Sequence, residues 1–276
     1  MEYTKVVKAK FISRENRFVA SVQLYGSNEA VKVHVKNTGR CKELLVPGAT
    51  VWLEDFEGRM GGRKMRYSLV CVEKENAGAN GGRLLINMDS QAPNKVVQEV
   101  LEQGMLLPGM DSPATFIKPE HTFGKSRFDF YIEWTAHNVS ANKVNDSQNA
   151  CAQGNDALFM NKAFIEVKGV TLEDKGFARF PDAPTERGLK HVNELIDAVQ
   201  AGYKGYIIFV IQMNDITGFG PNYETHPAFG EALLQAKAAG VNILAYDCTV
   251  TPDSLIINTQ LEDSCIHLNK NRLLLD

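Results

Sequence analysis

Two stretches that alternate between apolar and polar residues most constrain the fold of this chain, because a period of two predicts half-buried β-strands. The first runs through residues 128–134, where every second side chain is aromatic or aliphatic and Asp129 lies on the opposite face. The second runs through residues 163–170 and places Glu166 and Lys168 on one face, roughly 7 Å apart along the strand. If the two strands pair as a hairpin, these three charged side chains converge.

A convergent pair of carboxylates indicates a cation site. Two carboxylates at one location repel each other, so both stay ionised at neutral pH mainly when a cation lies between them. Oxygen ligands with open positions suit Mg²⁺ or Mn²⁺. Lys168 could orient a metal-bound water and stabilise charge that develops on phosphorus, which is the apparatus for hydrolysing a phosphodiester. Glu-x-Lys alone is common on the solvent face of a strand, so the prediction depends on Asp129 as well.

This constellation resembles the motif of the PD-(D/E)xK nuclease superfamily. The core of that superfamily is an α-helix, a three-stranded meander, a second helix and a further strand. By position, Asp129 matches its metal-binding aspartate, Glu166 its second metal ligand and Lys168 its lysine. Many members add a carboxylate from the first core helix. The candidates for it here are Glu99, in the first expected helix, and Glu120, shortly before Asp129.

The first 75 residues contain short β-patterns separated by turn signals such as Pro47-Gly48 and Gly61-Gly62. Five strands at this spacing predict a small closed barrel. Residues 39–45 are expected to form a helical turn between the third and fourth strands, as in an OB-fold. The expected strands are residues 5–12, 18–25, 30–35, 50–56 and 65–73.

The amino-terminal part is also the basic part. Residues 1–83 contain 15 Lys and Arg against 9 Asp and Glu, and the remainder contains 15 against 24, within a net charge of −3. A basic module beside an acidic one fits a phosphate-binding domain attached to a metal-binding domain, although such an imbalance also arises by chance. The expected nucleic-acid contacts are Arg14, Arg17, Lys36, Asn37, Arg40, Arg63, Lys64 and Arg66, and, in the second domain, Arg127, Thr185, Arg187, Lys190, His191 and Gln212.

Residues 84–276 are expected to form the second domain, after a Gly- and Ala-rich stretch at 75–82 that is interpreted as a linker. A polar run at 137–156 has no usable period and is interpreted as a mobile insertion. The alternation of strands and helices implies a mixed sheet flanked by helices. Besides the two strands above, the expected elements are a strand at 84–87, a helix at 93–103, a helix entered near Thr185 and ended by Gly202, a strand at 206–211, a helix at 229–239, a strand at 241–246 and a peripheral tail after Cys248.

Cysteine spacing and hydropathy exclude several protein classes. The five cysteines form no C-x-x-C pair and leave one over, which is typical of reduced thiols and not of a disulfide framework or a zinc site. No apolar run reaches the roughly 20 residues that span a bilayer, and none follows a basic start. We therefore expect a cytoplasmic protein with no membrane partner.

Four separated motifs, at residues 37–40, 126–130, 166–172 and 180–188, occur in an order that resembles the sugar fermentation stimulation protein A family. The resemblance covers about residues 3–246. It implies an α+β protein of two domains, an OB-fold-like barrel followed by a PD-(D/E)xK nuclease-like mixed sheet. It also implies DNA binding with little sequence preference, a bacterial or archaeal cytoplasm, and a role in regulating sugar metabolism, notably that of maltose.

Three functions remain open at this point. The first is a DNA-binding nuclease that uses Mg²⁺ or Mn²⁺ at Asp129 and Glu166, with Lys168 positioning water. The second is a non-catalytic DNA-binding regulator that uses the nuclease fold as a scaffold. The third is an enzyme that acts on RNA, which an OB-fold permits equally. The intact carboxylate pair and Lys168 favour the nuclease, because a site without catalytic activity has no physical reason to retain two carboxylates that repel each other. No helix-turn-helix pattern supports sequence-specific promoter recognition.

Overall fold

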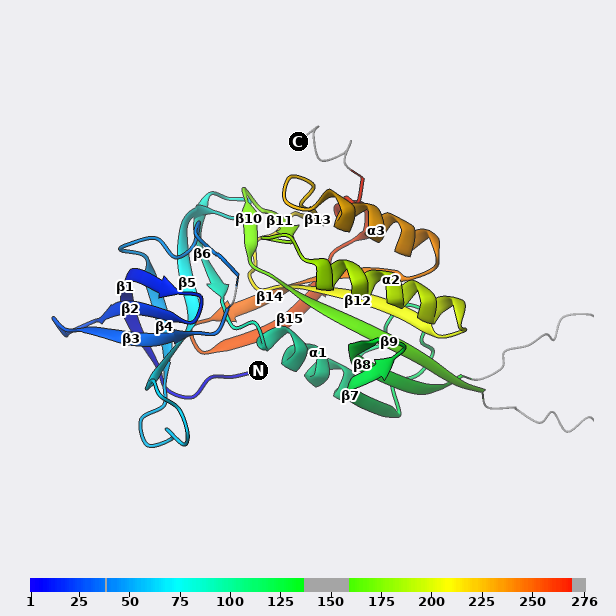
Figure 1. Cartoon of the computed structure of the whole chain (residues 1–276), viewed down its shortest axis with the longest axis horizontal. Helices are drawn as coiled ribbons and strands as arrows, with labels where there is room; N and C mark the ends of the chain where they lie inside the picture. Colours follow the sequence, from blue (N-terminus) through cyan, green and yellow to red (C-terminus); the bar gives the residue numbers. More distant parts are fainter. Residues whose placement is uncertain (38, 137–158, 270–276) are drawn as a thin grey trace, which may run out of the picture.

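The computed structural model describes residues 1–37, 39–136 and 159–269. The insertion expected at 137–156 therefore lies outside the described residues. The protein is elongated, with a β-barrel at one end and a helix-covered sheet at the other (Figure 1). This is a two-domain α+β fold, as predicted. No helix within the described ranges is long and apolar enough to cross a membrane.

The barrel confirms the OB-fold prediction. Its first sheet has the order β3-β2-β1-β4-β5-β6, and a parallel pairing of β3 with β5 closes the first five strands into a barrel. One helical turn between β3 and β4 is completed by a hydrogen bond from the Leu45 N–H to the Cys41 carbonyl at 2.9 Å. The strands are β1 (Val6–Asn16), β2 (Val19–Leu24), β3 (Ala30–Val35), β4 (Thr50–Asp55), β5 (Tyr67–Ala77) and β6 (Gly82–Asn87).

The stretch at 75–82 is a hairpin turn and not a linker. β5 continues to Ala77, and β6 pairs antiparallel with it, so the strand expected to open the second domain belongs to the first sheet. The second domain holds this turn, because the Asn80 amide donates to Asp215 Oδ1 at 2.8 Å and the Ala79 N–H donates to the Asp215 carbonyl at 3.2 Å. A polar, Gly-rich composition suits a tight turn as well as a linker, and only the contacts distinguish them.

The second domain contains a six-stranded mixed sheet of order β15-β14-β12-β9-β8-β7. β9, β12 and β14 are parallel neighbours, whereas β7, β8 and β9, and also β14 and β15, pair antiparallel. The strands of this sheet are β7 (Phe116–Phe123), β8 (Ser126–Ala136), β9 (Phe159–Val170), β12 (Lys204–Ile211), β14 (Asn242–Thr251) and β15 (Ser254–Gln260). The helices are α1 (Ala92–Glu102), α2 (Glu186–Gln200), α3 (Pro227–Ala238) and a 3₁₀ turn, η1 (Asp263–Cys265). A small sheet consists of β10 (Leu172–Asp174), β11 (Phe177–Phe180) and β13 (Gly218–Pro221).

Several strands were not expected from the sequence. β7 and the small sheet fall in stretches without a clear alternating pattern, and β15 corrects the prediction of a peripheral tail. β15 pairs with β14 from Thr251 and Ser254 to Tyr246 and Gln260. Leu255 is fully buried in it. The tail completes an edge of the sheet because pairing with β14 satisfies backbone groups that a free strand would leave to water.

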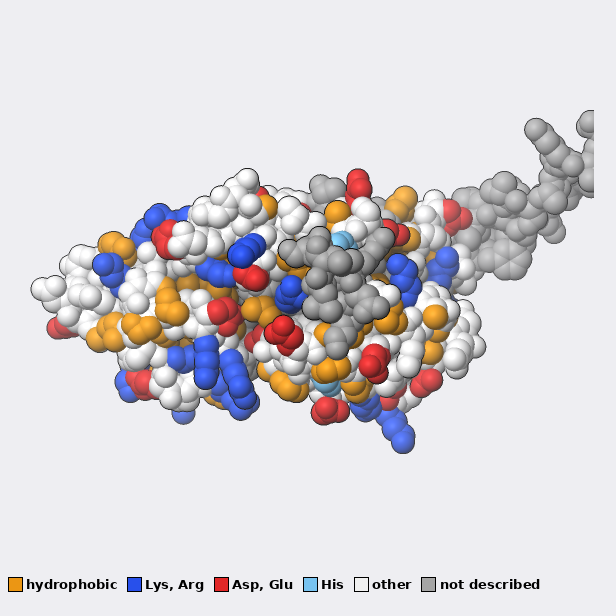
Figure 2. All heavy atoms as spheres, turned by 90° about the horizontal axis from the view of Figure 1, so that it is seen from above, with side chains coloured by type: hydrophobic (Ala, Val, Ile, Leu, Met, Phe, Trp, Pro, Cys, Tyr) orange, Lys and Arg blue, Asp and Glu red, His pale blue; other side chains and the backbone are white. Residues whose placement is uncertain are grey.

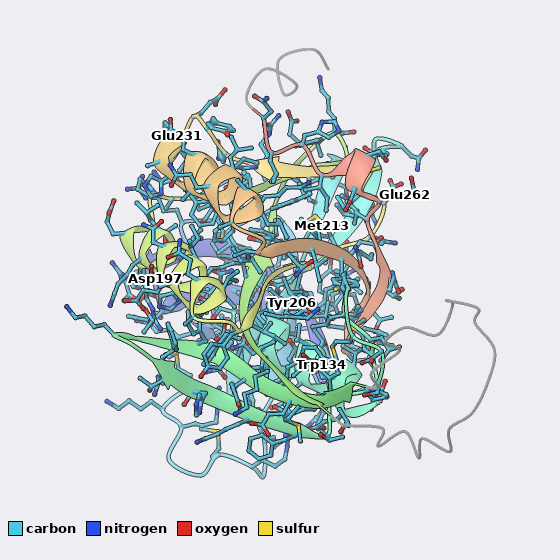
Figure 3. The ribbon with its side chains drawn as sticks, turned by 90° about the vertical axis from the view of Figure 1, so that its right-hand side faces the viewer. Trp134, Asp197, Tyr206, Met213, Glu231 and Glu262 are labelled. Carbon is cyan, nitrogen blue, oxygen red and sulfur yellow. The ribbon has the colours of Figure 1, made fainter. Side chains whose placement is uncertain are left out.

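Helices cover both faces of this sheet. Val96 and Val97 of α1 share one hydrophobic cluster with Ile165, whereas Val192 of α2 shares the opposite cluster with Phe164. Figure 1 shows α2 and α3 on the side of the sheet away from α1, and Figure 3 shows the helices that carry Asp197 and Glu231, α2 and α3, side by side. β12 is buried from Gly205 to Ile211, as expected of a central strand. The cluster on the α2 face also continues into the barrel, so one core joins the two domains.

Candidate metal centre

Asp129 lies where β8 separates from β9. The backbone pairing of these strands ends at Phe130 and Ile165. Beyond it, the Val167 N–H donates to Asp129 Oδ2 at 2.8 Å, so a carboxylate takes the place of a strand partner. Asp129 Oδ1 accepts a second hydrogen bond from the Asn94 amide of α1 at 2.7 Å. The break in the ladder thus points this carboxylate toward β9.

The same break moves Phe128 to the other face of the sheet. The sequence pattern predicts that Phe128 and Phe130 share a face, and the structure shows that they do not. Phe128 packs against Phe164 and His191, with ring centroids 5.3 and 6.1 Å away, on the α2 side. Phe130 belongs to the cluster on the α1 side. A simple period of two cannot predict this change, because it depends on the Asp129 carboxylate entering the ladder.

Glu166 is 3% exposed and faces α2. Its Oε1 accepts a hydrogen bond from the Lys168 ammonium and contacts Nδ1 of His191. Its Oε2 is buried and has no hydrogen-bond partner among the described residues. Burial of a carboxylate oxygen without a donor is costly, so this atom is positioned for a ligand that the protein itself does not provide.

The two carboxylates interact electrostatically. Burial raises the pKa of Asp129, and the charge of Glu166 raises it further. Burial also acts to raise the pKa of Glu166, but the hydrogen bond with His191 and the charge of Lys168 outweigh it and leave this pKa lowered. The surroundings therefore favour the ionised form of Glu166 and disfavour that of Asp129.

Neither predicted third carboxylate lies with the pair. Glu99 Oε2 contacts the amino group of Met1 at 2.7 Å, and the side chain of Glu120 is 68% exposed and pairs with Arg127 at 3.4 Å. Glu99 follows Asn94 by five residues, which is about 140° around the helix, so it points away from Asp129. Within the described ranges, no three His, Cys, Asp or Glu side chains are grouped to hold a metal ion. α1 contributes an amide to the site, and no carboxylate.

Two protein-family models match this chain over separate ranges. The model described as "Sugar fermentation stimulation protein RE domain" matches residues 91–254, and "SfsA N-terminal OB domain" matches residues 12–81. A "Sugar fermentation stimulation protein homolog" of Desulfitobacterium hafniense is 49% identical over 257 residues, covering 92% of this chain and 94% of the relative. The chain belongs to the sugar fermentation stimulation protein family.

Other members of the sugar fermentation stimulation protein family match over nearly the whole chain. The homolog of Clostridium beijerinckii is 47% identical and covers 95% of this chain and 99% of its own. A solved structure of SfsA from Pyrococcus furiosus in complex with Ca²⁺ is 26% identical, with a TM-score of 0.73. It covers 97% of this chain and 98% of that one. Both domains therefore recur together in the family.

Several basic residues predicted to contact nucleic acid are used inside the fold. Arg14 donates to the carbonyls of Asn16, Arg17, Asn37, Gly39 and Arg40, at 2.7–3.2 Å. Arg66 pairs with Asp55 through two hydrogen bonds of 2.7 and 2.8 Å. Lys36 is largely buried and pairs with Asp89 at 2.7 Å. These charges hold the barrel together, which a count of basic residues does not reveal.

Gln212 is enclosed beside the end of β9 and is not exposed at the site. It is 1% exposed, and its amide donates to the Asn87 carbonyl, to Asn87 Oδ1 and to the Asp89 carbonyl at 2.9–3.1 Å. It therefore joins the end of β12 to the chain that leaves the barrel. A nucleic acid does not reach a side chain enclosed in this way, so the predicted contact at Gln212 is wrong.

Of the remaining predicted nucleic-acid contacts, some make contacts within the protein and others are exposed to solvent. Thr185 Oγ1 caps α2 by accepting from the Gly188 N–H at 3.0 Å, and Asn37 Oδ1 accepts from the Gly39 N–H at 2.8 Å. Arg63 stacks on the Phe56 ring, 3.6 Å from its centroid. The exposed candidates are Arg17, Arg40, Lys64, Arg127, Arg187 and Lys190.

Sequence reasoning missed one contact of the carboxylate pair and predicted another only in part. Asn94 was not singled out, although a polar residue in the first turn of a helix is a common partner for a nearby strand. The helix face that carries His191 is predicted to point toward the metal site as well as to contact nucleic acid, and His191 lies buried against Glu166. The signal for His191 is its position on a different face of the helix from the apolar stripe.

Proposed function

We propose that this protein binds DNA with little sequence preference and hydrolyses phosphodiesters with a divalent cation held by Asp129 and Glu166. The observation that carries the proposal is the buried carboxylate pair, in which Oε2 of Glu166 has no donor among the described residues. Burial and mutual repulsion disfavour two negative charges here, and a cation would relieve both. The donor set fits Mg²⁺ or Mn²⁺, because Mg²⁺ often binds through one or two carboxylates and retains several waters.

The Ca²⁺ in the related Pyrococcus furiosus structure supports a divalent cation in this protein as well. Ca²⁺ and Mg²⁺ are both hard cations that prefer oxygen ligands. When bound, such an ion would polarise a phosphoryl oxygen and lower the pKa of a coordinated water. We assign this site to Mg²⁺ or Mn²⁺ in the reaction.

The residues around the pair have separate roles in this proposal. Asn94 and the Val167 N–H hold the Asp129 carboxylate, and His191 holds Oε1 of Glu166. Lys168 places its ammonium beside Glu166, where it would stabilise negative charge on a phosphoryl group. The basic barrel would contact the DNA backbone, which accounts for binding without base recognition.

A second candidate is a non-catalytic DNA-binding protein with the nuclease fold as its scaffold. One observation favours it: within the described residues, no three His, Cys, Asp or Glu side chains are arranged to hold a metal ion. In either case, the family name connects the protein with regulation of sugar metabolism. We propose a cytoplasmic setting for both, where DNA is available.

The deciding experiment is cleavage of supercoiled plasmid and of labelled single strands with Mg²⁺, Mn²⁺, Ca²⁺ or EDTA. Asp129→Asn and Lys168→Ala should each lower the metal-dependent rate by 100-fold or more. Glu99→Gln serves as the matched control, because Glu99 lies away from the pair, and it should retain the wild-type rate. Tight DNA binding without cleavage under any metal, unchanged by these substitutions, would establish the non-catalytic alternative.

A further inference from the structure

A surface pocket of the barrel concentrates unpaired positive charge. Arg17, Arg40 and Lys42 line it, and all three side chains are exposed. None of the three has an ion-pair or hydrogen-bond partner for its side chain within the described part of the chain. Arg14 forms the inner wall and holds the loop that carries Arg40 through its bonds to backbone carbonyls. The pocket is therefore shaped by one arginine and charged by three other cations.

An exposed aromatic ring lies beside this pocket. Phe18 follows Arg17 directly and is 49% exposed. Its carbonyl accepts from the Val35 N–H at 2.8 Å, which places it next to the strand end that leads into the loop at 37–40. Exposed aromatic rings beside cationic side chains are the combination with which OB-folds stack unpaired bases and neutralise phosphates. A base within a duplex is already stacked on both faces and cannot use such a ring.

The pocket lies where the barrel meets the second domain. Gly39 lies so close to the second domain that a Cβ added to it would be 2.4 Å from Asp182 Oδ2. Burial raises the pKa of the Cys41 thiol, whereas the side chain of Thr171, which lies close to the thiol, acts to lower it. Thr171 follows Lys168 by three residues, which is about 10 Å along an extended chain. The pocket thus lies beside the part of the second domain into which β9 leads from the carboxylate pair.

We infer that this surface binds an unpaired DNA strand, with Phe18 stacked on a base and Arg17, Arg40 and Lys42 on phosphates. The inference rests on the proposed function and narrows its substrate to DNA with a single-stranded segment. Two carboxylates, Asp182 and Glu43, border the pocket near Cys41. Three free cations exceed them, so the local charge still favours a polyanion. Figure 2 shows Lys and Arg side chains on the barrel and at its border with the second domain.

The test is fluorescence anisotropy in EDTA, so that binding is measured without cleavage. The probes are a labelled 20-nucleotide DNA, the same strand in a duplex, and RNA of the same sequence. Phe18→Ala should weaken binding of the single-stranded DNA about tenfold and leave duplex binding within twofold. Arg40→Gln and Lys42→Gln should each weaken binding and lower the slope of log affinity against log salt by about 0.7.

Phe116→Ala and Lys237→Gln are the matched controls. Phe116 is 48% exposed on β7, and Lys237 is exposed on α3, and both should bind like wild type. Equal loss in Phe18→Ala and Phe116→Ala, no single-strand binding, or preferential RNA binding would overturn the inference. The two proposals fail under different results. Single-strand binding that depends on Phe18, without any cleavage, would contradict the proposed function and support this inference. Metal-dependent cleavage with DNA binding unchanged by substitution of Phe18, Arg40 and Lys42 would overturn this inference and support the proposed function.

Discussion

Asp129 shows how one residue can serve a site at a cost to stability. It accepts two hydrogen bonds, and burial together with Glu166 still raises its pKa. A carboxyl with a raised pKa contributes to folding stability below its unfolded value, near 3.8, and loses that contribution as the pH rises through its folded pKa. At neutral pH without a cation, its ionised form therefore opposes folding.

Asp129→Asn should accordingly unfold at a temperature a few degrees higher than wild type at pH 7 in EDTA. The difference should shrink toward pH 4, where wild-type Asp129 becomes protonated. Ca²⁺ or Mg²⁺ should raise the melting temperature of the wild type and not that of the variant. Glu120→Gln, at an exposed carboxylate, is the control and should match wild type under all of these conditions. A metal-induced shift of equal size in Asp129→Asn would exclude Asp129 as a ligand.

Arg14 illustrates a charged residue whose partners are all backbone. Its guanidinium donates to carbonyls on both the β1–β2 turn and the loop at 37–40. Arg14→Lys retains the charge and loses the planar set of donors, so we expect a loss of about 2 kcal/mol in the free energy of unfolding. Arg17→Lys should change it by less than about 0.5 kcal/mol, because Arg17 is exposed. Urea denaturation measures both, and equal effects would contradict the structural role of Arg14.

At the scale of elements, β9 is the strand on which the site is built. It pairs with β8 on one side and β12 on the other, and it carries Glu166 and Lys168 toward α2. Gly169 follows at the point where α1 approaches closely. A Cβ there would lie 2.5 Å from Gln212 Oε1 and 2.7 Å from Pro93 Cγ. The approach of α1 that brings Asn94 to Asp129 thus depends on the absence of a side chain at Gly169.

Gly169→Ala should therefore lower the free energy of unfolding by about 1–3 kcal/mol, because Gln212 is held by hydrogen bonds and the Pro93 ring is rigid. The same variant should bind metal more weakly, since displacement of α1 moves Asn94. Gly62→Ala is the matched control, because a Cβ at Gly62 meets no atom within 4 Å. Chemical denaturation and calorimetric metal titration give the two measurements. If Gly169→Ala and Gly62→Ala had equal free energies of unfolding, α1 would be able to shift away from the added methyl group without loss of stability.

At the scale of the whole molecule, the two domains share a core and a buried ion pair. Leu69 of the barrel and Phe209 of the second domain belong to one hydrophobic cluster. Glu173 is fully enclosed, accepting from Lys74 Nζ at 2.8 Å and from the Gly78 N–H at 2.9 Å across the domain boundary. The two domains are therefore joined by apolar packing and by a charged contact.

We expect the domains to unfold together. The chain has two tryptophans, Trp52 in β4 of the barrel and Trp134 in β8 of the second domain. In Trp52→Phe and Trp134→Phe the remaining indole reports on one domain. Each fluorescence transition in urea should coincide with the circular dichroism transition of the same variant. Glu173→Gln should shift both midpoints downward together. Two separated midpoints in either protein would mean that the domains unfold independently.

The sequence by itself determined the first five strands of the barrel, the three helices and the central strands of the second domain, and the positions of Asp129, Glu166 and Lys168 on neighbouring strands. These follow from local properties, because a period of two or of 3.6 and the position of a turn residue are read within one segment. The pairing of Glu166 with Lys168 is local in the same sense, since the two residues are neighbours on one strand face.

Only the tertiary structure decided which partners these residues have. Asn94 and Asp129 are 35 residues apart, Glu166 and His191 are 25 apart, and Gln212 and Asn87 are 125 apart. No periodicity within a segment carries such contacts, because they depend on how elements pack. For the same reason composition shows that Arg14 and Arg40 are both cationic, whereas packing assigns one to the backbone and leaves the other to solvent.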